Sequence, residues 1–145
     1  MLIKKSLKNL ILIFLVIIHS CERGQPVFGE NGMVVSTSSQ ASQVGIDIMK
    51  AGGNAIDAAT AVGFALAVTS SSNGNIGGGG FMTVKLENGN SFTLDYREMA
   101  PKAASRNMYL DQEGNVIKGK SRYTHFATGV PGSVDGLLKA WRDYG

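Results

Sequence analysis

The residues best suited to chemistry in this 145-residue sequence form the short run Asp95-Tyr96-Arg97-Glu98. The run directly follows a segment with the pattern of a strand, and a strand end holds a functional side chain in a defined position. A guanidinium such as that of Arg97 suits a planar carboxylate, because its fork donates two parallel hydrogen bonds. The competing interpretation is a local ion pair of Arg97 with Asp95 or Glu98. The residues alone leave both interpretations open.

A second candidate is the glycine run Gly77–Gly80, which follows Asn73-Gly74-Asn75. Phosphate-binding loops place their glycines after a strand and before a helix, and a lysine follows. Here the glycines precede a strand-like segment and no lysine follows at once, which argues against nucleotide binding. Two interpretations remain: a tight connector in a crowded core, or backbone that lines a substrate pocket.

Histidine and cysteine usage argues against several other kinds of site. The histidines are His19 and His125, and they form no cluster with metal-ligand spacing. We expect His125 to be a structural side chain rather than a base. Serines are frequent, but no Gly-x-Ser-x-Gly motif presents one as a nucleophile. The residues therefore predict no catalytic nucleophile, no metal site and no cofactor.

The N-terminus has the features of an exported protein. Residues 1–20 combine a basic start with an apolar run over 10–18, which is typical of a signal peptide and too short for a comfortable transmembrane span. The single cysteine, Cys21, follows Ser20 in a pattern similar to the lipobox of bacterial lipoproteins, although His19 fits that pattern poorly. We predict lipidation of Cys21, and the alternative is ordinary cleavage that leaves the thiol unmodified.

Composition and charge bound the rest of the chain. The hydrophobic content of 43% is enough for the core of one domain, while 19 glycines against 3 prolines indicate turns and close approaches of the backbone. Three of the fourteen basic residues lie within 1–20, which leaves eleven basic and eleven acidic side chains. No basic stripe remains, so a nucleic-acid partner is not expected. Residues 21–31 are predicted to be a tether before a domain at 32–145.

The first half of that domain is predicted to hold a strand and two helices. Residues 33–35 are a short apolar strand candidate. Ser38 or Ser39 is expected to cap a helix that reaches about Lys50, where Gly52-Gly53 ends it in a left-handed cap. Asn54 is then expected to cap a second helix over 55–68. Since this helix is small or apolar on nearly every face, we expect it to be central and buried.

The second half is predicted to hold a hairpin and a final helix. Residues 81–86 and 91–95 are expected to pair around Asn88-Gly89, with positive φ at both turn residues. In the helix over 133–144, an apolar face is expected from Val134, Leu137, Leu138 and Trp141. The fold class is therefore mixed α/β (α+β) in layers. With so few strands to cover its apolar helices, the chain is expected to be truncated and to fold poorly alone.

Four segments in order resemble the bacterial γ-glutamyltransferase (γ-glutamyl transpeptidase) family, in the N-terminal part of its large subunit. They are residues 43–59, 74–82, 95–101 and 129–134, and together the matching region covers most of 32–145. One departure is Ser70-Ser71, where many members have a His-Pro pair. The resemblance implies an N-terminal-nucleophile hydrolase fold, an αββα sandwich of which this chain would be an incomplete N-terminal part.

The resemblance also implies a mechanism and a role for one residue. In that family the precursor cuts itself, and the new N-terminal threonine of the small subunit is the nucleophile, with its own α-amino group as base. That threonine would lie beyond Gly145, so no catalytic residue is assigned here. The arginine of the family's Asp-aromatic-Arg-Glu motif binds the α-carboxylate of the γ-glutamyl substrate, and in this sequence it is Arg97. The glycine run would be a close-packed wall beside it.

The function expected from this resemblance is an exported enzyme that transfers the γ-glutamyl group of glutathione and related compounds to water, amino acids or peptides. Its partner would be the small subunit from the same precursor, and it would touch the membrane only through a lipid on Cys21, in the periplasm or cell envelope. The alternatives are a related acylase, a poly-γ-glutamate-processing transferase, or a non-catalytic envelope lipoprotein.

Overall fold

The computed structural model describes residues 24–145, so the signal segment and Cys21 lie outside the described residues. The chain divides into two units, at Met33 and Val34. The described part of the first unit, residues 24–33, is exposed and contains no helix or strand. Within the described residues no helix is both long and apolar enough to cross a bilayer.

Helices α2 (Ser39–Lys50) and α3 (Ala55–Thr69) form a capped helical pair, as predicted. The side chain of Ser38 accepts the backbone N–H of Ala41, which begins α2. Gly52, at φ 100°, ends α2, and the N–H of Gly53 returns to the carbonyl of Ile48. The next cap is reciprocal: Asn54 accepts from the first turn of α3 while the carboxylate of Asp57 accepts the N–H of Asn54.

Strands β1 (Phe81–Lys85) and β2 (Ser91–Asp95) form the predicted antiparallel hairpin, with Phe81 opposite Asp95. The predicted turn geometry is wrong, because only Gly89 has positive φ, at 85°. The N–H of Gly89 bonds to the carbonyl of Leu86, and Leu86 pairs with Asn90. The connection is thus a three-residue loop, in which a single left-handed residue is enough.

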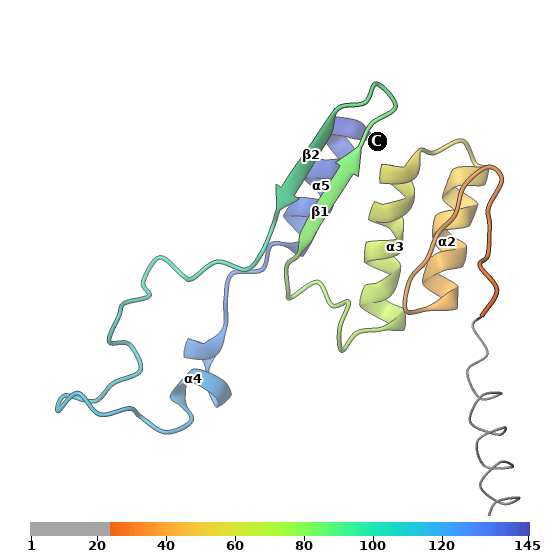
Figure 1. The fold of residues 1–145 in the computed structure, drawn as a ribbon. Coiled ribbons are helices and arrows are strands. Elements are labelled where there is room, and N and C mark those ends of the chain that lie inside the picture. Colours follow the sequence, from red (N-terminus) through yellow and green to blue (C-terminus); the bar gives the residue numbers. More distant parts are fainter. Residues whose placement is uncertain (1–23) are drawn as a thin grey trace, which may run out of the picture. The chain divides into compact units, whose positions relative to one another are not determined.

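Helix α5 (Ser133–Tyr144) packs against both the hairpin and α3, and α3 stands between α2 and α5 (Figure 1). Side chains from these elements form one small core around Ile56, Val84 and Ala140. The expected central position of α3 is confirmed, but the helix is buried only in part: four of its fifteen residues are buried, all between residues 56 and 62, and Val68 near its end is 83% exposed. Between β2 and α5 lie α4 (Lys120–Tyr123) and the 3-10 helix η1 (His125–Ala127), which contact no other helix or strand of the described chain.

One further prediction about these elements is wrong, and another is wrong in part. Residues 33–35 form no strand, because no strand of the described chain pairs with them. The predicted apolar face of α5 is confirmed at Leu137, which is buried, and Leu138 is half-buried. It is wrong at Val134 and Trp141, which are 38% and 50% exposed, and the other buried residues are Ser133, Gly136 and Ala140. Small residues are buried there because Tyr96, directly after the hairpin, packs closely against α5.

The small core leads to a prediction about the isolated chain. Seven hydrophobic residues are buried in the described structure, three of them alanine, and no large side chain is fully buried. This small amount of apolar burial offsets only part of the conformational entropy that the chain loses on folding. Residues 32–145 produced alone are expected to unfold broadly on heating, as followed by circular dichroism at 222 nm. A sharp transition that coincides with loss of the near-ultraviolet signal of Trp141 would contradict this.

Candidate functional site

The hairpin fixes where Arg97 stands. Past the end of β2, Tyr96 continues the pairing with Gly80: its N–H donates to the carbonyl of Gly80 at 3.0 Å, and the N–H of Gly80 donates back at 3.4 Å. Arg97 is therefore opposite Gly79, one position farther along. Because side chains alternate along a strand, Asp95 and Arg97 share the face that carries Phe81. Tyr96 points to the other face, toward α5.

Arg97 makes the local ion pair that the sequence left open, and the partner is Asp95. The Nε of Arg97 lies 3.6 Å from Oδ1 of Asp95, and the same oxygen accepts the backbone N–H of Arg97 at 3.1 Å. The guanidinium carbon lies 4.9 Å from the ring centroid of Phe81. The side chain remains 64% exposed. Since the ion pair uses the Nε end, the terminal nitrogens stay accessible and carboxylate binding is still open to them.

The glycine run packs directly against this segment. A Cβ at Gly79 would stand 2.6 Å from both the Cα of Arg97 and the carbonyl oxygen of Tyr96. The carbonyl of Gly78 accepts the N–H groups of Gly132 and Ser133 at 2.9 and 3.1 Å, which satisfies the start of α5. The glycines are therefore a tight connector that brings three of the sequence motifs together. The atom of Gly78 that faces α5 is a carbonyl, which does not suit phosphate.

Tyr96 anchors the hairpin to α5. A Cβ at Gly136 would overlap the ring and Cβ of Tyr96, and a Cβ at Gly132 would overlap its carbonyl. Burial raises the pKa of the Tyr96 phenol above its usual value of 10.0, so the side chain is neutral at physiological pH. Close beside this contact, Met99 and Val130 exchange two backbone hydrogen bonds, of 3.1 and 2.8 Å. The segments on both sides of Arg97 are thus held by α5 and by the segment that leads into it, which contains Val130 and Gly132.

A cavity of about 120 Å³ lies behind the glycine run. It is lined by Gly63, Leu66, Asn73, Gly74, Asn75, Ile76, Gly79, Tyr96, Ser133 and Leu137. Its walls include Gly79 of the glycine run and Tyr96, but Arg97 does not line it. The guanidinium therefore faces away from this cavity, on the open face of the hairpin.

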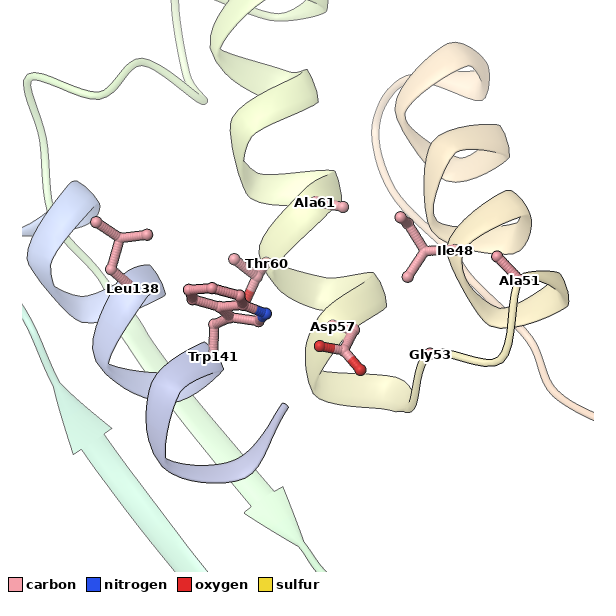
Figure 2. Close-up of a pocket in the computed structure, with 8 residues that line it drawn as sticks. All are labelled: Ile48, Ala51, Gly53, Asp57, Thr60, Ala61, Leu138 and Trp141. Carbon is pink, nitrogen blue, oxygen red and sulfur yellow. The ribbon is translucent and has the colours of Figure 1, made fainter.

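A larger groove, of about 440 Å³, lies between α2, α3 and α5 (Figure 2). It is lined by Ile48, Ala51, Gly53, Asp57, Thr60, Ala61, Leu138 and Trp141. The one carboxylate there, that of Asp57, already accepts the backbone N–H of Asn54 at 2.9 Å. None of the residues around Arg97 lines this groove, so it supports no chemistry linked to the candidate site.

The remaining sequence candidates stay apart from the site. Within residues 24–145 no group of histidine, cysteine and carboxylate side chains is arranged to hold a metal ion. His125 is exposed on η1 and lies against the ring of Phe126, with centroids 4.2 Å apart. Glu98 forms no ion pair with Arg97 in the described structure, and its carboxylate lies beside Gly78.

Two contacts of the site were not predicted from the sequence: that of Phe81 with Arg97, and that of Tyr96 with α5. The contact of Phe81 with Arg97 depends on the strand register, which a hairpin pattern alone does not specify. A signal for Tyr96 was present: Gly132 and Gly136 are four residues apart, so they mark one face of α5 where a bulky group can approach closely.

The described helices and hairpin form part of the fold of an N-terminal-nucleophile hydrolase. The crystal structure of Helicobacter pylori γ-glutamyltranspeptidase matches it with a TM-score of 0.79 and 45% identity, over 83% of this chain and 35% of that one. The family model of gamma-glutamyltranspeptidase matches residues 41–145. The chain belongs to the γ-glutamyltranspeptidase family, as the four segments predicted.

Curated relatives agree with this family. The glutathione hydrolase proenzyme of Pseudomonas sp. strain A14 is 56% identical over 128 residues, which cover 88% of this chain and 22% of that protein. The glutathione hydrolase proenzyme of Escherichia coli K12 is 53% identical over 120 residues, 83% of this chain and 21% of that protein. The chain thus spans about a fifth of the length of these relatives.

Proposed function

We propose that the complete protein is a γ-glutamyltransferase and glutathione hydrolase, and that the described chain supplies a residue that binds the substrate. The observation that carries this proposal is the placement of Arg97. Its guanidinium is exposed at a strand end between Asp95 and Phe81, within the region that matches the family model. A fixed, accessible guanidinium is suited to the α-carboxylate of a γ-glutamyl group.

The reaction we propose is acyl transfer in two steps. A threonine hydroxyl, in a part of the protein beyond Gly145, attacks the γ-carbonyl of the donor; an ester forms and the donor's amine leaves with a proton. Water or an amino group then attacks the ester, which releases glutamate or a new γ-glutamyl compound and restores the hydroxyl. No residue of the described chain is assigned to bond making. Arg97 holds the donor so that the γ-carbonyl is correctly placed.

The experiment that tests this uses the product of the complete reading frame. We expect it to appear as two chains on a denaturing gel and to release p-nitroaniline from γ-glutamyl-p-nitroanilide. A self-cleaved protein without this activity would indicate the acylase or polymer-processing alternative. A protein that neither cleaves itself nor releases p-nitroaniline would indicate the non-catalytic envelope lipoprotein.

We further propose that the protein is exported and anchored through Cys21, in the periplasm or cell envelope. The support is the sequence pattern of residues 1–21. Expressed in a bacterial host, the protein is expected to have a mature N-terminus at Cys21 whose mass includes acyl chains, and Cys21→Ser is expected to release it into the soluble fraction. An unlipidated N-terminus, determined by intact-mass spectrometry, would contradict the anchor and leave export to be judged by cell fractionation.

A further inference from the structure

Three side chains meet on the open face at the end of the hairpin. Gly80 and Tyr96 exchange both of their backbone hydrogen bonds, so the neighbouring pair, Phe81 and Asp95, is of the non-hydrogen-bonded kind, whose side chains approach more closely. Arg97 follows Asp95 by two residues and so lies on the same face. The register of the hairpin therefore brings a ring and a carboxylate to this guanidinium.

Asp95 holds one end of the guanidinium and leaves the other end accessible. Its Oδ1 lies 3.6 Å from Nε and also accepts the backbone N–H of Arg97, so a single oxygen ties the side chain to its own backbone. A guanidinium has five N–H donors, and four of them are on the terminal nitrogens. Within residues 24–145 no hydrogen bond reaches those terminal nitrogens, and the edge that suits a carboxylate remains available.

Phe81 holds the guanidinium from one side. The ring lies under the guanidinium carbon at 4.9 Å, and a cation above an aromatic face is attracted to the electron-rich ring. This attraction holds the guanidinium carbon of Arg97 over the ring of Phe81. Asp95 and Phe81 thus both limit where the guanidinium lies.

We propose that Asp95 and Phe81 are positioning residues that orient the terminal nitrogens of Arg97 toward the α-carboxylate of the substrate. This inference rests on the proposed function and assigns neither residue a contact with substrate. It opposes a simpler view, in which the negative charge of Asp95 only weakens the attraction of Arg97 for an anion. The two views differ in sign: removing the charge of Asp95 weakens substrate binding if Asp95 orients Arg97, and strengthens binding if it merely neutralises Arg97.

The test uses Asp95→Asn and Phe81→Leu in the product of the complete reading frame. The first keeps an oxygen for the backbone N–H of Arg97 and removes the charge, and the second keeps apolar volume and removes the ring. For γ-glutamyl-p-nitroanilide we expect KM to rise about 3- to 5-fold in each variant, with kcat nearly unchanged, since exposed ion pairs and cation–π contacts are individually modest. For the 4-aminobutyryl anilide, which lacks the α-carboxylate, we expect no change.

Matched controls are available elsewhere in the chain. Asp143→Asn removes the 2.7 Å ion pair with Lys139 on α5, and Phe126→Leu removes the ring under Lys120, 4.7 Å away. Both controls are expected to leave KM for both substrates unchanged. A KM for the γ-glutamyl anilide that stays constant or falls in Asp95→Asn would overturn the proposal. So would equal effects of Asp95→Asn or Phe81→Leu on both substrates, which indicate only a structural role.

A binding measurement separates this inference from the proposed function. If the wild-type protein does not hydrolyse the γ-glutamyl anilide, the proposed function fails, and calorimetry with L-glutamate then decides the inference. L-glutamate that binds the wild type, and binds Asp95→Asn several-fold more weakly, would support the positioning role. Equal binding by both proteins, or no binding by the wild type, would overturn it.

Discussion

Replacing Arg97 with alanine is expected to lower kcat/KM for γ-glutamyl-p-nitroanilide by about 30- to 150-fold, which corresponds to about 2–3 kcal/mol for the loss of charge-assisted hydrogen bonds to a carboxylate. Arg97→Lys keeps the charge and loses the fork, so we expect an intermediate loss. The side chain is 64% exposed, and its removal leaves the core untouched. Self-cleavage into two chains is therefore expected to continue in both variants, as judged on a denaturing gel.

The control for this result is a second arginine with a comparable local role. Arg142, on α5, donates from Nε to the carbonyl of Leu138 at 3.2 Å and lies outside the site. Arg142→Ala is expected to retain wild-type kcat/KM. If Arg97→Ala also retained it while the wild type is active, Arg97 would make only the ion pair with Asp95, and the carboxylate would have to be bound elsewhere in the protein.

The helices and the hairpin could be predicted because their signals are local. The cap at Ser38 and the capping box of Asn54 and Asp57 use hydrogen bonds between residues at most three positions apart, so the sequence contains all that they require. The hairpin follows from two alternating segments around a short polar loop. In each case the decisive interaction partner is near in the chain.

The features that could not be predicted depend on partners that are distant in the chain. Residues 33–35 have the composition of a strand, but a strand requires a neighbour, and none pairs with them in the described structure. Hydrophobic spacing assigned Trp141 to the buried face of α5, whereas the approach of Tyr96 buries Gly136 instead. The same distinction holds for the candidate site. Its motif, residues 95–98, could be identified from the sequence, whereas the contact of Phe81 with Arg97 depends on the strand register.

Substituting Gly136 is expected to have the largest effect on folding of any change considered. A Cβ there would overlap the Cβ and ring of Tyr96, near the point where Tyr96 pairs with Gly80 and the chain continues into Arg97. Tyr96 cannot move without shifting that backbone, and α5 cannot withdraw without exposing Ala140 and Leu137. Overpacking of this kind typically costs about 1–3 kcal/mol, and the rigid surroundings favour the upper end for Gly136→Ala. We expect soluble, self-cleaved protein to fall at least several-fold, as measured by quantitative gel analysis.

Two further variants determine whether the steric conflict with Tyr96 is the cause. Gly63→Ala, on α3, would place its Cβ 2.8 and 3.0 Å from the two terminal methyls of Leu137. These are the end of a flexible side chain rather than backbone, and alanine favours the helix, so a change of less than about 1 kcal/mol is expected. Tyr96→Gly removes both the Cβ and the ring that obstruct a larger residue, and the loss from combining it with Gly136→Ala should be smaller than the sum of the two single losses. Additive losses would mean that the side chain of Tyr96 is not what Gly136 accommodates. In that case the close approach of the hairpin to α5 would not explain why glycine, rather than a larger apolar residue, lies on the buried face of this helix.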